Sequence, residues 1–307
     1  MARERRFDLL AIGDPCADVL VATTRMPVWD DKTVGSALGV LAGGTEANVA
    51  CAAARLGLRV AAFGRVGGDA HAALLRDDFV RHGVQVEHLL ACPDGQSAMA
   101  LVFISPHGER AVVWVPASGP APERTAELEA ALRESRIAYT MPYQMAPLRT
   151  LAAAAQRCGT QLAIDIERET VLQAGGLAGL LAHADIAFMN ETGFSAAFGT
   201  APSRDAVAAL CQAGRAHTVV VTLGARGALA ADRHGSAEQA AYPAQLVDAT
   251  GAGDSFNAAF LCAQLRGHTL QQRLAVACAA ASRTVAAVGA RGALAQPAFI
   301  QTLTPPT

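Results

Sequence analysis

Short apolar segments alternate with alanine-rich segments of helical periodicity along most of this chain, and this alternation most constrains its fold. Consecutive strand–helix units place parallel strands in one sheet and helices against its faces. The pattern therefore predicts an α/β fold with a mostly parallel central sheet and right-handed crossovers. A chain of 307 residues is long enough for one large domain, so we expect a single domain over residues 1–307. The predicted strands are residues 7–12, 59–63, 161–166, 186–189 and 218–222, and the predicted helices are residues 46–56, 72–82, 148–157, 170–183 and 204–214.

Two regions, within about residues 19–41 and 97–116, break this rhythm. The second contains two alternating segments, residues 100–105 and 110–115, joined by a turn-like sequence at 106–109. Alternation with a period of two is typical of strands with one buried face. We therefore expect antiparallel strands outside the main sheet, which together form a small lid.

Composition limits the kind of partner. The net charge is −2 and the pI about 6.4, with 5% aromatic residues, which does not favour binding to nucleic acid or to an anionic membrane surface. Every apolar run is broken well before the roughly 18 residues of a membrane span. The seven cysteines are scattered and form no CxxC pair, so we interpret them as buried thiols in a reducing cytoplasm. A small-molecule partner is expected.

The most informative segment is the glycine-rich turn at residues 246–256, which precedes the apolar helical segment 257–265. Helix N-terminal amides lack intrahelical acceptors and attract anions, so the amides of Gly251, Ala252 and Gly253 are a candidate phosphate site. An acid inside such a turn would repel phosphate, but it makes sense as a base that takes a proton from an attacking hydroxyl group. Asp254 is that candidate base. The alternative is an ordinary helix N-cap.

Residues 248–254 (DATGAGD) closely resemble the D-T-x-G-A-G-D signature of the PfkB family of carbohydrate kinases, the ribokinase-like sugar kinases. Three further segments are similar to motifs of that family in the same order: residues 43–48 (GGTEAN), 64–69 (GRVGGD) and 221–227 (VTLGARG). The resemblance extends over nearly the whole chain. It implies a ribokinase-like fold and transfer of the γ-phosphoryl group of ATP to an alcohol of a sugar or nucleoside.

The resemblance also implies roles for individual residues. Asp254 would be the catalytic base, and the amides of residues 251–253 would stabilise charge on the transferring group. Asp18 matches an acidic position that grips acceptor hydroxyls, and a carboxylate accepts two such donors at once. The implied acceptor-binding residues are Asp18, Gly43, Gly44 and Asn48, and the implied nucleotide-binding residues are Thr222, Gly224, Gly227 and Cys278.

Metal ions are implied as well. Mg²⁺ accompanies ATP in such transfers because it neutralises the β- and γ-phosphates. Asp248 and Thr250 occupy the position of a monovalent-cation loop that some relatives have, which makes K⁺ a candidate second ion. Asn190 and Glu191 are the candidate Mg²⁺ residues, acting through water, because Gly193 stands where the family's N-x-x-E motif places its glutamate.

Other departures from the family pattern concern Ala249, Glu46 and Cys278. Ala249 replaces a threonine. Glu46 either faces the acceptor or is an acid in the first turn of its helix, and the second interpretation is favoured. Cys278 replaces an asparagine that lies near the adenine in many relatives.

Several alternatives stay open. The chain is a sugar kinase, a nucleoside kinase of the same family, or a catalytically weak sugar- or nucleotide-binding protein on this scaffold. A nucleotide-dependent oxidoreductase is disfavoured because Gly13, Gly43 and Gly44 form no GxGxxG motif. The acceptor is undetermined, and exposed edges of lid strands suggest a homodimer.

Overall fold

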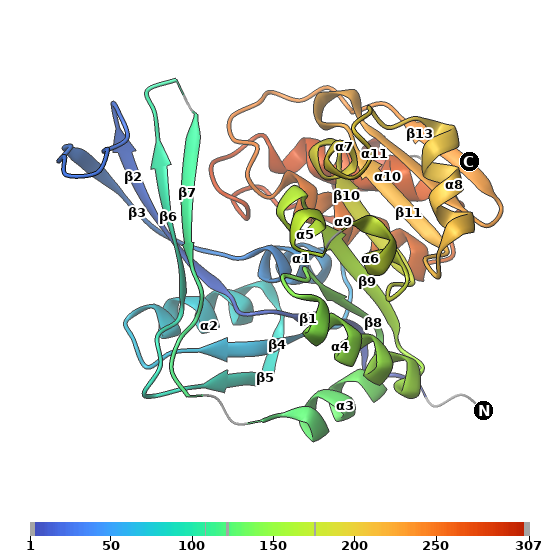
Figure 1. The fold of residues 1–307 in the computed structure, drawn as a ribbon, viewed down its shortest axis with the longest axis horizontal. Helices are drawn as coiled ribbons and strands as arrows, with labels where there is room; N and C mark the ends of the chain where they lie inside the picture. Colours follow the sequence, from blue (N-terminus) through green and yellow to red (C-terminus); the bar gives the residue numbers. More distant parts are fainter. Residues whose placement is uncertain (1–3, 108, 121–122, 175, 304–307) are drawn as a thin grey trace.

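The computed structural model describes residues 4–107, 109–120, 123–174 and 176–303, and these residues form a three-layered core with a separate small sheet beside it (Figure 1). The central layer is a nine-stranded sheet in which seven neighbouring strands run parallel and two antiparallel strands close one edge. The α/β prediction is therefore confirmed. In spatial order the strands are β13 (Gly235–Gln239), β12 (Ala228–Asp232), β11 (Thr218–Thr222), β10 (Ile186–Asn190), β9 (Gln161–Ile166), β8 (Ser135–Thr140), β1 (Phe7–Ile12), β4 (Val60–Val66) and β5 (Gln85–Ala91).

Helices cover both faces of this sheet because its strands are apolar on both sides. Leu9 packs into one core and its neighbour Leu10 into the other, as the alternation of a strand requires. The helices on the Leu9 side are α1 (Thr45–Arg55), α2 (His71–His82), α9 (Ala252–Leu265), α10 (Leu270–Thr284) and α11 (Pro297–Leu303). Those on the Leu10 side are α3 (Thr125–Arg133), α4 (Met145–Cys158), α5 (Arg168–Gln173), α6 (Leu177–Leu181), α7 (Glu191–Phe198) and α8 (Arg204–Ala213).

The second sheet stands to one side of the core and is the lid expected from the sequence (Figure 1). Its strands, in spatial order, are β3 (Gly35–Gly43), β2 (Cys16–Thr23), β6 (Ala98–Ile104) and β7 (Arg110–Val115). The first lid region is longer than predicted, since it begins at Cys16 and ends at Gly43. The central pair β2–β6 is parallel, contrary to the antiparallel expectation, because the chain passes through β4, α2 and β5 before it enters the lid again. Gly108, in the predicted 106–109 turn, lies outside the described residues.

Other expectations need correction. The helix predicted over residues 170–183 is divided into α5 and α6, and Gly176, with φ 129°, precedes α6. Strands β5, β8, β12 and β13 were not predicted, because they carry too little regular apolar patterning to stand out. Among the described residues, no helix combines the length and the apolar character needed to cross a membrane.

Candidate active site

Two pockets open on either side of the N-terminus of α9. The first has a volume of about 780 Å³ and lies between the core and the lid, and Asp254 is part of its wall. The second, of about 530 Å³, is lined by Ala252 and Gly253 together with residues of β11, α10 and the segment that precedes α9. The glycine-rich turn therefore separates a pocket under the lid from a pocket over the core.

The two glycines of the turn serve different purposes. Gly251 has a φ of 75°, and a Cβ atom there would lie 2.5 Å from the Cβ of Ala290. Gly253 has ordinary backbone angles and would present a Cβ to open space. Within the described part of the chain, the amides of Gly251, Gly253 and Asp254 have no acceptor, whereas Ala252 donates a long bond of 3.3 Å to Ala249 O. The helix end thus offers free donors to an anion, as expected for a phosphate site.

Asp254 lies in the first turn of α9, half-buried, with its carboxylate directed to α1. Its Oδ2 accepts a hydrogen bond of 2.7 Å from Asn48 Nδ2. Burial raises the pKa of Asp254 to about 8; the Asn48 bond opposes this shift, and the charges of Asp165 and Glu46 add to it. A carboxyl group with a pKa near neutrality is suited to accept a proton and to release it.

Glu46 and Asp165 are two of the acidic neighbours of Asp254, together with Glu167. Glu46 lies in the first turn of α1 and also lines the first pocket. Its carboxylate is buried and accepts a bond from Met141 N at 3.0 Å, and burial raises its pKa to about 7. Asp165, at the end of β9, accepts bonds from Tyr139 Oη at 3.0 Å and Asn257 Nδ2 at 2.9 Å. Burial raises the pKa of Asp165 to about 7 as well.

Three of the four predicted acceptor residues, Asp18, Gly44 and Asn48, line the first pocket. Gly43 lies beside it, and a Cβ on Gly43 would lie 2.2 Å from Asp18 Oδ2, so glycine makes room for the carboxylate. Gly44 begins α1 with a φ of 95°. Burial raises the pKa of Asp18, although the Cys16 thiol and the charges of Arg291 and Arg110 oppose this shift.

The predicted nucleotide residues line the second pocket: Thr222, Gly224, Gly227 and Cys278 all belong to its wall. Gly227 cannot carry a side chain, since it has a φ of 105° and a Cβ would lie 1.9 Å from Gln239 O. Burial raises the pKa of Cys278 to about 12, so the thiol stays protonated.

The candidate magnesium residues lie in neither of these two pockets. Asn190 is the N-cap of α7 and accepts a bond of 2.7 Å from Gly193 N. Glu191 forms an ion pair of 2.5 Å with Arg226. Gly193 has no positive φ, but a Cβ there would lie 2.9 Å from Ile166 O. Close packing of Gly193 against β9 therefore leaves little room for a glutamate side chain at this position.

The candidate monovalent-cation residues lie near the lid. Asp248 Oδ1 accepts bonds from the amide and the hydroxyl group of Thr250 at 2.8 and 2.7 Å, and its Oδ2 accepts one from Gly289 N at 2.8 Å. Arg110, from lid strand β7, forms an ion pair with the same carboxylate. Four donors occupy about the full acceptor capacity of a carboxylate. The lid is thereby tied to the loop before α9.

Sequence reasoning missed several polar residues of the first pocket and of its surroundings. Asp165 and Glu167 lie at the carboxyl end of a predicted strand, where α/β sheets bind ligands. This position could have identified them as candidate site residues. Arg65 and Arg110 also line this pocket. Arg65 belongs to the 64–69 motif and Arg110 begins the predicted 110–115 strand, but neither was predicted as a site residue. Arg291 reaches the site from the loop after α10 and carries no local signal.

Comparison with known proteins places the chain among sugar kinases. The ribokinase of Bacillus subtilis (strain 168) is 25% identical over 296 residues, which cover 94% of this chain and 96% of that protein. Fructoselysine 6-kinase of Escherichia coli (strain K12) is 28% identical over 292 residues, covering 92% and 98%. The structure of Arabidopsis thaliana ribokinase complexed with ribose and ATP superimposes with a TM-score of 0.84 at 27% identity, covering 98% and 99%.

The family assignment rests on nearly the whole length of the chain. The model of the pfkB family carbohydrate kinases matches residues 7–297, which include the core, the lid and the α9 turn. The motifs recognised in the sequence meet around the two pockets described above. This chain belongs to the pfkB family of carbohydrate kinases.

Proposed function

We propose that this kinase transfers the γ-phosphoryl group of ATP to a hydroxyl group of a small sugar or related polyol. One observation supports this most directly. The α9 turn presents free amides between a pocket lined by the predicted nucleotide residues and a pocket lined by Asp254, Asp18 and Asn48. A phosphoryl group held at the turn would therefore lie between its donor and its acceptor.

The proposed phosphoryl transfer uses Asp254, the amides of the α9 turn, and the polar residues of the first pocket. The acceptor oxygen attacks the γ-phosphorus while its proton passes to the Asp254 carboxylate, and the bond between that phosphorus and the β–γ bridging oxygen breaks to release ADP. The amides of Gly251 and Gly253, together with Ala252 if it gives up its long bond, stabilise the negative charge of the transferring group. Asp18 and Asn48 orient the acceptor from the lid and from α1.

The chain's own candidate metal residues do not fit a resident ion. Asn190 caps a helix, Glu191 is paired with Arg226, and Asp248 already accepts four hydrogen bonds. We therefore write Mg²⁺ as part of the Mg·ATP substrate. K⁺ has no role in the proposed mechanism, because the Arg110 guanidinium supplies the positive charge beside Asp248.

The acceptor pocket limits the candidate substrates. It carries acidic side chains suited to several hydroxyl groups, and the side chains of Trp114 and Tyr143 stack at its wall with ring centroids 5.0 Å apart. The volume of about 780 Å³ and these aromatic rings make a nucleoside the second candidate acceptor. Retention of Asp254 and of the free amides argues against a protein that only binds its ligands.

We also propose a homodimer formed through the lid. By the pairing register, Val40, Val19, Leu101 and Val113 form one row across the lid sheet, on the face opposite Asp18 and Trp114. Val113 is half exposed and Val40 is exposed too. An apolar sheet face with open edge strands is suited to pairing with a second copy.

The seven free cysteines and the use of ATP favour the cytoplasm as the compartment.

A substrate screen tests the proposed function. The protein is incubated with Mg·ATP and a panel of pentoses, hexoses, ketoses, polyols and nucleosides, and ADP release is followed together with the phosphorylated product. We expect ADP release that depends on one class of acceptor. The proposal would be overturned if ADP release did not depend on any acceptor, or if no acceptor produced ADP release. Light scattering on the same protein tests the proposed dimer.

A further inference from the structure

The loop after α10 places one arginine behind the acceptor pocket, 243 residues from its partner in α1. The Arg291 side chain is only 8% exposed. Its Nε donates to Asn48 Oδ1 at 2.9 Å, and its Nη2 donates to Gly43 O at 3.1 Å. Its Nη1 forms an ion pair with Asp78. Each of the three guanidinium nitrogens thus has a partner around the segment that precedes and begins α1.

These contacts determine which way the Asn48 amide points. A guanidinium group has only donors, so the atom of Asn48 that faces Arg291 must be the oxygen. The NH₂ group then faces the opposite direction, where it donates to Asp254 Oδ2 at 2.7 Å. With the amide reversed, its NH₂ group would face the arginine and its oxygen would face the carboxylate, which is unfavourable on both sides.

We propose that Arg291 is a positioning residue that fixes the orientation of the Asn48 amide and thereby favours the ionised form of the Asp254 carboxylate. The effect is chemical as well as structural. An N–H donor stabilises a carboxylate, and the proposed base must be ionised to accept a proton. The link to catalysis rests on the proposed function, whereas the link to the ionisation of Asp254 does not.

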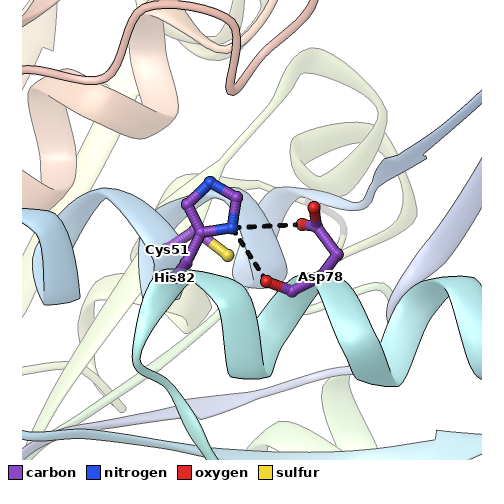
Figure 2. A group of neighbouring side chains, drawn as sticks. All are labelled: Cys51, Asp78 and His82. Atoms are coloured by element: carbon purple, nitrogen blue, oxygen red, sulfur yellow. Dashed lines mark hydrogen bonds and ion pairs between the residues drawn. The ribbon is translucent and has the colours of Figure 1, made fainter.

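Asp78 anchors the arginine. Figure 2 shows that the His82 ring is directed at Asp78, with Cys51 beside them. His82 Nδ1 lies 2.8 Å from Asp78 O and 3.5 Å from its carboxylate. Burial alone would raise the pKa of Asp78, but the His82 bond and the Arg291 charge lower it to about 2. Since these two groups already balance its charge, we interpret this cluster as an anchor and not as a metal site.

Several groups act on Asp254. Among them, only the hydrogen bond from Asn48 comes from a side chain that Arg291 contacts directly, whereas Asp18 feels only the charge of Arg291, which Arg291→Lys keeps. The polar and charged groups around Asp254 are Glu46 and Asn48 on α1, Tyr139 on β8, Asp165 on β9, Glu167 after β9, and Asp18 and Arg110 from the lid across the same pocket.

The test measures the ionisation of Asp254 directly. Protein with ¹³C-labelled aspartate carboxyl groups is titrated by NMR, and the Asp254 signal is identified by its loss in Asp254→Asn. In Arg291→Lys the ammonium group keeps the ion pair with Asp78 but lacks the planar fork that reaches Asn48 and Gly43. We expect the Asp254 midpoint to rise by about one pH unit.

Two further variants keep the test independent of folding. Arg291→Met combined with Asp78→Asn removes both charges of the buried pair. His82 then lacks the carboxylate that raises its pKa, so it can lose its proton and leave no buried charge behind. The Asp254 midpoint should rise in this variant as well. Arg215→Lys is the matched control, because Arg215 forms a similar forked pair with Asp185, at 3.0 and 3.2 Å, and lines neither pocket. It should leave the midpoint unchanged.

A double-mutant cycle shows whether the effect passes through Asn48. In an Asn48→Ala background, Arg291→Lys should produce no further shift, because no amide remains to be oriented. The acid limb of kcat/KM should follow the NMR midpoint, with a loss of about tenfold near neutral pH that recovers as the pH rises.

The outcomes separate this inference from the proposed function. An unchanged Asp254 midpoint in Arg291→Lys and in the Arg291→Met/Asp78→Asn variant overturns the inference, even if the parent phosphorylates a sugar. A full shift that persists in the Asn48→Ala background overturns it too. If the midpoint moves as expected but the parent phosphorylates no acceptor, the proposed function fails and the assignment of Arg291 stands.

Discussion

The two pockets beside α9 differ in the kinds of side chain that line them. Among the described residues, the wall of the second pocket carries no Asp, Glu, Lys, Arg or His side chain and consists largely of small and apolar groups. The first pocket carries charges of both signs, namely Asp14, Asp18, Glu46, Glu167 and Asp254 against Arg65 and Arg110. The contrast indicates that the nucleotide side would depend on shape and backbone amides, and the acceptor side on charged and hydrogen-bonding side chains.

The two pockets should also differ in how they affect the stability of the folded protein. Buried carboxyl groups that lie close together disfavour one another's ionisation, so the acidic residues of the first pocket lower the free energy of unfolding, whereas the uncharged second pocket has no such effect. Residues of the first pocket should therefore combine large effects on catalysis with small or even favourable effects on folding. Residues of the second pocket should affect nucleotide binding through steric fit.

The largest effect is expected for Asp254→Asn. The amide can still accept the Asn48 hydrogen bond but cannot take a proton, so kcat should fall by about 10²- to 10⁴-fold. ATP binding in the second pocket, measured by calorimetry, should be retained. Near-normal turnover with the true acceptor would remove Asp254 from the mechanism.

The same variant has a predictable pH dependence of stability. The folded-state pKa of Asp254 is raised to about 8, so its ionisation destabilises the folded state increasingly as the pH rises from the unfolded-state pKa toward the folded-state value. Asp254→Asn should therefore have a higher Tm than the parent at alkaline pH, and the difference should shrink toward acidic pH. A Tm difference that does not change with pH would contradict this prediction.

A smaller loss is expected for Asp18→Ala. This substitution removes an acceptor for substrate hydroxyl groups, so KM for the acceptor should rise by about tenfold or more and kcat should fall as well. KM for ATP should change little, because Asp18 lines only the first pocket. Kinetics that match the parent for its best acceptor would place Asp18 outside the binding site.

The glycines of the turn allow a matched comparison. Gly251→Ala forces a side chain into a positive φ and against Ala290, which should cost about 1–3 kcal/mol of unfolding free energy. Gly253→Ala meets open space, so its Tm should stay close to that of the parent while KM for ATP rises. Equal thermal stability of the two variants would refute the different roles assigned to them.

Gly193→Ala should have a smaller effect, confined to stability. Its Cβ would lie 2.9 Å from Ile166 O, so the Tm should fall by a few degrees while the Mg²⁺ dependence of the rate stays unchanged. Gly193→Glu is expected to be less stable still. If Gly193→Glu folds well and needs less Mg²⁺, a carboxylate at this position does serve the metal.

The smallest effect is expected when K⁺ is replaced by a large organic cation. The rate should change by less than about twofold, because four donors already surround the Asp248 carboxylate. Arg110→Ala tests this explanation further. Loss of the guanidinium group beside Asp248 should make the rate depend on K⁺. A strong K⁺ requirement in the parent would show that Arg110 leaves Asp248 during turnover.

Much of the fold and part of the site were predictable from the sequence. Alternating strand and helix patterns predicted the parallel sheet, and the 248–254 motif indicated the helix N-terminus with Asp254 in its first turn. Strands β12 and β13 were missed because the alanine-rich β12 (ALAAD) and the short polar β13 (GSAEQ) lack a clear apolar period. The sequence left Glu46 either as a first-turn acid or as a residue that faces the acceptor, and in the structure it lies in the first turn of α1 and lines the first pocket.

Features that depend on neighbouring residues, such as the turn at Gly251 and the free amides after it, follow from the amino-acid sequence alone. Consecutive residues set backbone angles and helix ends locally, and such features can be recognised in a motif. The contacts of Arg291 with Asn48 and of Arg110 with Asp248 appear only in the folded protein, because they join residues 243 and 138 positions apart. These contacts depend on how distant loops and the lid pack against the core, and no local pattern of residues encodes that packing.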